Sequence, residues 1–196
     1  MINILLSIVT ISYIIKYLGT IEYGLFVIYK LFTIHGFLLL LEFGLRKPFA
    51  REFAICNVNG NYRRLNSLAT ILIILSVGIS TLMVFGSLYL PVYLVEWVNI
   101  PIDKKDEFTQ VLKYTFILTI IDIPGLFIAS LYEGLNMYKK LKLLELIQLL
   151  VVSIGHVSLV ILGHDYIALI YYLMVITALF SMLRLIVMYR HKSNVF

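Results

Sequence analysis

The sequence predicts an all-α integral membrane protein with about six transmembrane helices, and three observations carry this prediction. Hydrophobic residues make up 61% of the 196 residues, charged residues make up 14%, and the mean hydropathy is +0.97. A soluble domain has about 45–50% apolar and about 25% charged residues, so a water-soluble globule is excluded. The apolar residues also form runs long enough to cross a bilayer, which takes about 20 helical residues. Basic residues separate these runs.

Composition excludes several other classes of protein. A single cysteine, Cys56, cannot form an internal disulfide, and a chain rich in Ile, Leu, Phe and Tyr has ample surface to bury. The net charge of +5 is spread between the apolar runs and forms no continuous patch, so we expect no nucleic-acid partner. We therefore expect one transmembrane helical domain over residues 1–196, in contact with membrane lipids.

The first two spans are expected at residues 2–18 and 23–44. Residues 2–18 are apolar but short for a span, and no basic stretch precedes them. They also lack the charged region and the cleavage site of a signal peptide. Residues 23–44 are interrupted by Lys30 and end near Glu42, and they still fit a span.

Four further spans are expected at residues 67–95, 111–132, 143–163 and 166–188. The uncharged residues 67–95 are the surest, with Pro91 as a candidate helix break near their end. In residues 111–132, Pro124 predicts a kink beside Asp122, because proline cannot donate to the carbonyl of the residue four positions earlier. The last two spans are so close in sequence that they predict a helical hairpin.

The basic residues favour one side of this topology. The segments 45–66 and 133–142 and the tail after Tyr189 carry ten of them, and four lie on the other side. The ten are Arg46, Lys47, Arg51, Arg63, Arg64, Lys139, Lys140, Lys142, Arg190 and Lys192. Because basic loops stay in the cytoplasm, both termini are expected there, with the acidic residues 96–107 outside.

Seven ionisable residues lie inside the predicted spans, namely Lys30, His35, Glu42, Asp122, Glu145, His156 and Arg184. A charge in hydrocarbon costs about 2.5–3.5 kcal/mol on insertion scales, so such residues usually face a bundle interior or a wet cavity. Helical periodicity places Gln148 and His156 on one helix face, and Thr177, Ser181 and Arg184 on another. Our candidate cavity residues are Lys30, His35, Gln148, His156 and Arg184. Asp122 is the candidate for coupling to an ion.

Each of these residues also has a structural interpretation. Glu42, Glu145 and Arg184 lie near the cytoplasmic ends of their spans, where long side chains reach the interface. His156 fits equally well as a neutral histidine hydrogen-bonded to a neighbouring helix. Three serines at positions 76, 80 and 87, with Gly78 between them, favour close helix packing over substrate contact. Tyrosines and Trp97 near span ends, Tyr132 and Tyr166 among them, fit interfacial aromatic belts.

The sequence carries no catalytic motif. It has no nucleophile elbow, HExxH motif, glycine-rich phosphate loop or Cys/His cluster, and its four histidines lie at different depths. We therefore expect no enzyme, no metal site and no cofactor.

Three segments carry a family resemblance: LGTIEYGLF at 18–26, LLLEFGLRKPFAREFA at 39–54 and NYRRLN at 61–66. They resemble the start of the polysaccharide biosynthesis flippases of the multidrug/oligosaccharidyl-lipid/polysaccharide superfamily, which include O-antigen and capsule repeat-unit flippases. The matching positions are Gly19, Tyr23, Gly24, Glu42, Gly44, Leu45 and Arg51. Residues 129–150, ASLYEGLNMYKKLKLLELIQLL, are similar to the family's fourth-to-fifth helix junction.

The resemblance implies the amino-terminal lobe of a two-lobe flippase. Such a protein moves an undecaprenyl-diphosphate-linked oligosaccharide across the bacterial inner membrane by alternating access. Family members are about twice as long as this chain and have two lobes, and a complete site needs both. The resemblance therefore implies a truncated gene, a split gene or a homodimer. Two alternatives remain: a multidrug cation exporter of the same superfamily, and a non-transporting membrane fragment or subunit.

Overall fold

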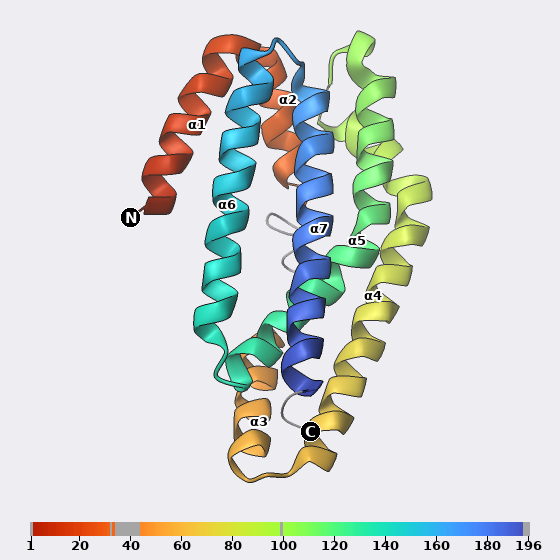
Figure 1. The fold of residues 1–196 in the computed structure, drawn as a ribbon. Coiled ribbons are helices and arrows are strands. Elements are labelled where there is room, and N and C mark those ends of the chain that lie inside the picture. Colours follow the sequence, from red (N-terminus) through yellow and green to blue (C-terminus); the bar gives the residue numbers. More distant parts are fainter. Residues whose placement is uncertain (1, 32, 34–43, 99, 194–196) are drawn as a thin grey trace.

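A computed structural model describes residues 2–31, 33, 44–98 and 100–193 (Figure 1). All its regular elements within these ranges are helices. They are α1 (Ile2–Leu18), α2 (Thr20–Leu31), α3 (Arg46–Val58), α4 (Tyr62–Trp97), the 3-10 helix η2 (Ile102–Lys104), α5 (Lys105–Gly134), α6 (Tyr138–Ile161) and α7 (Tyr166–Ser193).

Three helices, α4, α6 and α7, are long and apolar enough to cross a membrane, and α5 is a fourth if its two bent parts form one span. The chain is therefore a helical membrane protein, as its composition predicts. The six spans expected from the sequence are not shown. Helix α1 has 17 residues and α2 has 12, and residues 34–43 of the expected second span, with His35 and Glu42, lie outside the described residues.

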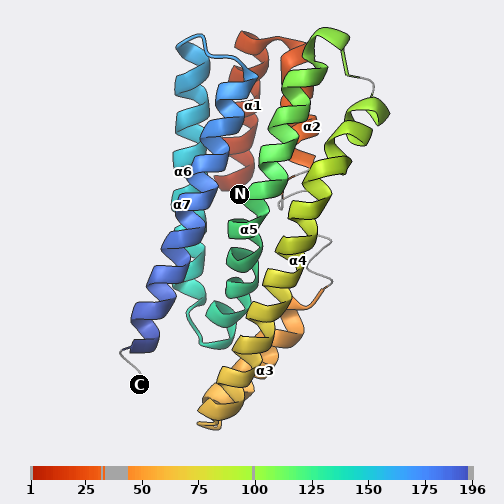
Figure 2. The ribbon, with the colours of Figure 1, turned by 90° about the vertical axis from the view of Figure 1, so that its right-hand side faces the viewer.

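The long helices form a row in the order α1, α6, α7, α5, α4, in which each helix packs on the next, and α2 packs against α1 and α7 (Figures 1 and 2). One end of the row, here called the α3 end, holds α3, the α5–α6 turn and the end of α7 (Figure 1). The opposite end holds the α1–α2, α4–α5 and α6–α7 connections. The basic segments 45–66 and 133–142 thus gather at the α3 end.

Two large apolar clusters hold the row together, and a third, smaller one around Tyr132 joins α5, α6 and α7. The first joins α1, α2, α5 and α7, with single residues of α4 and α6, towards the opposite end, around the fully buried Phe26, Phe108 and Tyr166. The second joins α3, α4 and α5, around Phe53 and Phe127. Because α5 contributes to both large clusters, it connects the two parts of the molecule.

Residues 45–66, expected to form a loop, are mostly helical. Phe49, Phe53 and Cys56 recur at helical spacing, and this apolar face of α3 packs on α4 and α5. The basic residues of this segment predict its side of the membrane, whereas the helical spacing of its apolar residues predicts α3. After α3 the chain turns at Gly60, which has φ +63°, and the Asn61 side chain accepts a hydrogen bond from the Arg64 amide at 3.1 Å.

The two prolines inside the long helices behave differently. The predicted kink near Pro124 is confirmed, because Ile102–Leu118 and Asp122–Gly134 meet at 49°. The helix break considered at Pro91 was wrong, since α4 continues to Trp97. Pro91 lies on the buried face of α4 between Ser87 and Val95, and packing on both sides holds the helix together across the missing hydrogen bond.

The predicted hairpin of the last two helices is confirmed. Gly163 turns the chain with φ +80°, and the His164 amide donates to the Leu159 carbonyl at 3.1 Å. Asp165 then caps α7, because its carboxylate accepts a hydrogen bond from the Ala168 amide at 3.2 Å. These bonds satisfy the backbone groups that two adjacent helix ends leave free.

Small residues set how closely the helices approach. The serines at positions 76, 80 and 87 are buried on the face of α4 that packs on α5, as predicted. Gly78 was wrongly grouped with them, because it is exposed and a Cβ there would meet nothing within 4 Å. Gly134, at the end of α5, lies directly against α3, and a Cβ there would overlap Phe53 and lie 2.8 Å from the Ala50 carbonyl oxygen.

Gly134→Ala should therefore destabilise the fold by about 1–3 kcal/mol, because the added carbon pushes α3 away from α5. Gly78→Ala is the matched control, and it should be neutral or stabilising by up to about 1 kcal/mol because alanine favours the helix. Thermal unfolding of the purified chain in detergent measures both. Equal effects of the two substitutions would contradict the close α3–α5 contact.

The arrangement also predicts which connections share a side of the membrane. Single cysteines at Asn61, Asn136, Asp103 and His164, in a Cys56→Ser background, should fall into two pairs when an impermeant thiol reagent is added to intact cells. Asn61 and Asn136 should react alike, and Asp103 and His164 should show the opposite accessibility. Equal labelling of Asn61 and Asp103 would refute this topology.

Candidate functional site

Arg184 lies among three helices and is tied to both neighbours of α7. Its Nη2 donates to the Oε1 of Gln148 on α6 at 2.5 Å. On the other side, the hydroxyl of Tyr132 on α5 donates to the Arg184 carbonyl oxygen at 2.8 Å. Tyr132 and Gln148 are buried and Arg184 is half-buried. The guanidinium thus has one hydrogen-bond partner among the described residues, the neutral amide of Gln148, and its Nε has none.

A carboxylate lies close to this arginine. Ser181, one turn before Arg184 on α7, donates from its Oγ to the Oδ1 of Asp122 at 3.3 Å. Asp122 follows the bend in α5, and Gly125 brings the two helices together, because a Cβ there would lie 3.0 Å from the Ser181 Oγ. Asp122 and Glu145 both attract the Arg184 guanidinium electrostatically. Together these residues form the Arg184 cluster: Asp122, Tyr132, Glu145, Gln148, Ser181 and Arg184.

His156 forms a second polar centre on α6. Its buried ring packs edge-on against Phe26 and Tyr172, with centroids 5.3 and 5.8 Å away, and lies within hydrogen-bonding reach of the backbone of Leu169 on α7. These surroundings fit a neutral histidine packed against neighbouring helices. The Nε2 atom has no partner in the described part of the chain, and buried nitrogens without a partner are uncommon.

Lys30 adjoins this second centre. Its side chain is exposed, and its Nζ lies 5.1 Å from the centroid of the Phe26 ring. Lys30 and His156 thus both contact the Phe26 ring. No carboxylate of the described residues forms an ion pair with Lys30. Lys30 and Arg184 belong to different centres, and their role as cavity residues stays a prediction.

The described positions that carry the family resemblance lie mainly in turns and on the surface. Gly19 and Gly44 have φ values of +83° and +67°, at the α1–α2 turn and before α3. Tyr23 packs on the first apolar cluster, and Arg51 is exposed on α3. Gly24 does not mark a close helix contact among the described residues, because a Cβ there would meet nothing within 4 Å.

The burial of several tyrosines inside the bundle is not predictable from the sequence alone. Tyr29 is buried, and its hydroxyl lies within hydrogen-bonding reach of Thr115. Tyr132 and Tyr166 were wrongly assigned to an interfacial belt, because both are fully buried. Their hydroxyls find partners inside the bundle, at the Arg184 carbonyl and the Glu107 carboxylate, which lies 3.3 Å from Tyr166. A tyrosine near a helix end looks the same in sequence in either setting.

Comparisons with known proteins add no further identification. No family model, curated protein or solved structure matches the chain. Among the residues that the structure describes, no group of three or more His, Cys, Asp and Glu side chains is placed to hold a metal ion. The candidate functional residues are therefore those of the Arg184 cluster and those around His156.

Gln148→Leu should destabilise the protein by about 1.5–3 kcal/mol, because it removes the hydrogen-bond acceptor of a charged donor inside the bundle. The double variant Gln148→Leu/Arg184→Met should recover much of this loss, since it also removes the unpaired charge. The free energy of unfolding in detergent is measured for the wild type, both single variants and the double variant, which together form a double-mutant cycle. Gln110→Leu, at an exposed position of α5, is the control. Strictly additive effects at 148 and 184 would show that the pair is not coupled.

Proposed function

We propose that the chain is one lobe of a transporter that moves an anionic, lipid-linked substrate across the membrane. The observation that carries this proposal is Arg184, a guanidinium inside membrane helices whose hydrogen-bond partner is neutral and whose Nε is unpartnered within the described residues. A guanidinium binds phosphate oxygens through paired hydrogen bonds. Arg184 forms no ion pair within the described residues, and in a water-poor bundle such a cation favours an anion, so a diphosphate is a fitting ligand.

The family resemblance supplies the identity of this substrate. It favours an undecaprenyl-diphosphate-linked oligosaccharide repeat unit of O-antigen or capsule, in the bacterial inner membrane. The excess of basic residues at the α3 end supports placing this end, with the end of α7, in the cytoplasm. Helix α1 begins part-way along the bundle (Figure 1), so the cytoplasmic amino terminus is proposed from the distribution of basic residues alone.

The Arg184 cluster also supports a way of coupling substrate to an ion. An incoming diphosphate would take the place of Gln148 at the guanidinium, and the carboxylate of Asp122 competes for the same charge. Asp122 sits next to the 49° bend of α5, so a change in its charge acts where the helix already departs from regular geometry. A second lobe or a second copy of the chain would provide the other wall of the path.

Binding to the purified chain tests the substrate class directly. Undecaprenyl diphosphate should bind the wild-type chain in detergent, and Arg184→Gln should weaken binding by about tenfold or more, because charge-assisted hydrogen bonds are lost. Arg184→Lys should retain part of the affinity. Lys113→Gln removes one positive charge from an exposed position of α5, away from the Arg184 cluster and from the basic α3 end, and should leave binding unchanged. Equal losses in the 184 and 113 variants would reject the assignment.

Transport is tested in a strain that lacks its repeat-unit flippase. We expect the monomeric chain alone not to restore surface polysaccharide, and the chain expressed with a flippase carboxyl-terminal lobe to restore it. Restoration by a demonstrated monomer would overturn the lobe assignment. Efflux of cationic drugs without flipping would favour the multidrug exporter, and no transport with any partner would favour a non-transporting subunit.

A further inference from the structure

The carboxylates at the α3 end are already engaged in ion pairs. Three acidic residues lie there among the described residues, and each contacts a basic side chain at 2.6 or 2.8 Å. The pairs are Arg46–Glu133, Arg64–Glu52 and Lys142–Glu145. They involve three of the nine described basic side chains at this end, and no further carboxylate of the described residues lies there to pair with the other six.

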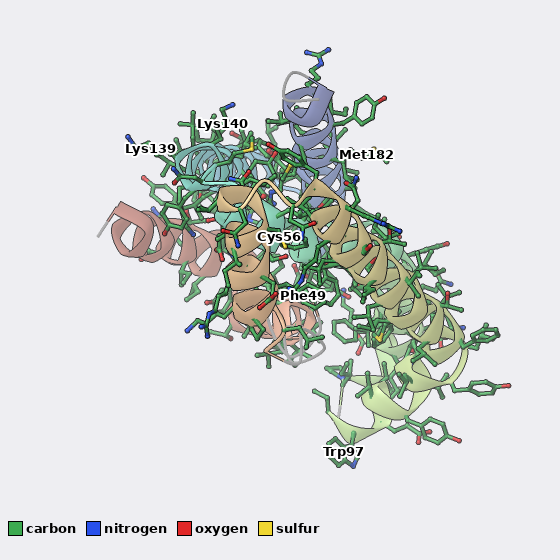
Figure 3. The ribbon with its side chains drawn as sticks, turned by 90° about the horizontal axis from the view of Figure 1, so that it is seen from below. Phe49, Cys56, Trp97, Lys139, Lys140 and Met182 are labelled. Atoms are coloured by element: carbon green, nitrogen blue, oxygen red, sulfur yellow. The ribbon has the colours of Figure 1, made fainter. Side chains whose placement is uncertain are left out.

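Six cations therefore remain without an ion pair in the described part of the chain. All six are exposed, and they come from α3, the start of α4, the start of α6 and the end of α7. They are Lys47, Arg51, Arg63, Lys139, Lys140 and Arg190. Figure 3 looks onto this end, where α3 lies near the centre and Lys139 and Lys140 project outward from α6.

Helix α3 presents a mixed basic and apolar stripe on its outer side. Lys47, Arg51, Ile55 and Val58 follow one another at spacings of four, four and three residues, so they share one face, and all four are exposed. The opposite face, with Phe53, is buried against α4 and α5. Cations beside exposed aliphatic side chains are typical of helices that lie in the headgroup region of a membrane.

The excess of cations is confined to this end. The opposite end carries six carboxylates and four lysines, and there Lys104 lies 4.0 Å from both Glu22 and Glu107. Charged residues that only hydrated the exposed surface would not need to be predominantly basic at one end and acidic at the other. Three helices long and apolar enough to cross a membrane, α4, α6 and α7, begin or end at the α3 end, so the cations there lie where membrane headgroups are expected.

We propose that the unpaired cations of the α3 end, with the outer stripe of α3, form a binding surface for anionic phospholipid headgroups of the adjacent leaflet. Clusters of four to eight Lys and Arg residues next to membrane helices attract such lipids. The aliphatic Ile55 and Val58 continue the same stripe and suit the apolar part of the interface. This surface is distinct from the Arg184 cluster and does not depend on the proposed transport function.

Lipid binding to the purified full chain in detergent tests the surface. Dioleoylphosphatidylglycerol and dioleoylphosphatidylcholine are titrated separately, and binding is followed by native mass spectrometry and by the unfolding midpoint. We expect phosphatidylglycerol to bind more tightly and to raise the midpoint more, since only the anionic headgroup pairs with the cations. The triple variant Lys47→Gln/Arg51→Gln/Arg63→Gln should weaken phosphatidylglycerol binding by about tenfold or more.

The matched control removes the same charge from the opposite end, in Lys16→Gln/Lys105→Gln/Lys113→Gln. It should bind phosphatidylglycerol as the wild type does. Equal binding of the two lipids, or equal losses in the two triple variants, would overturn the proposal. Binding of undecaprenyl diphosphate but not phosphatidylglycerol at this end would assign the surface to the transport substrate instead. Arg184→Gln should leave phosphatidylglycerol binding intact, so the two proposals fail separately.

Discussion

The bend in α5 is the constraint on which the rest of the structure depends. Pro124 cannot donate its backbone hydrogen bond, so the two parts of α5 point in directions that differ by 49°. The first part supports the apolar cluster shared with α2 and α7, and the second part meets α3 and the end of α7. At Gly125 and Gly134 this second part comes so close to its neighbours that a single added carbon would not fit without movement. A straight α5 would lose one of these two sets of contacts.

The same bend explains why polar groups can remain inside an apolar bundle. It brings Asp122 to Ser181 and the Tyr132 hydroxyl to the backbone of α7, so that Arg184 lies between α5 and Gln148 of α6. Each buried polar atom must find its partner within the protein, because the surrounding hydrocarbon offers none. The cluster satisfies most of these atoms and leaves one nitrogen of the arginine open. This unpartnered Nε of Arg184 can donate a hydrogen bond to an anionic ligand.

Charge divides the molecule along its length as clearly as packing does. At the α3 end each carboxylate that the structure describes pairs with an arginine or a lysine, while at the opposite end carboxylates outnumber lysines. Topology alone requires only that basic residues lie on one side. Here the cations are also exposed and extend over an amphipathic helix, which is an arrangement suited to contact with headgroups. In the two proposals, Arg184 binds a diphosphate inside the bundle and the outer cations bind phospholipid headgroups at the membrane surface.

The sequence by itself determined the membrane class, the last four helices with their hairpin, and the kink at Pro124, because each depends on local hydrophobicity or backbone chemistry. It also marked Gln148 and Arg184, since a polar residue in an apolar run is conspicuous. Only the tertiary structure decided which polar residues meet, because hydrogen bonds such as that from Arg184 to Gln148 join residues 36 positions apart. It likewise made residues 46–58 a helix and buried Tyr132, because the partner surfaces that stabilise them come from other helices.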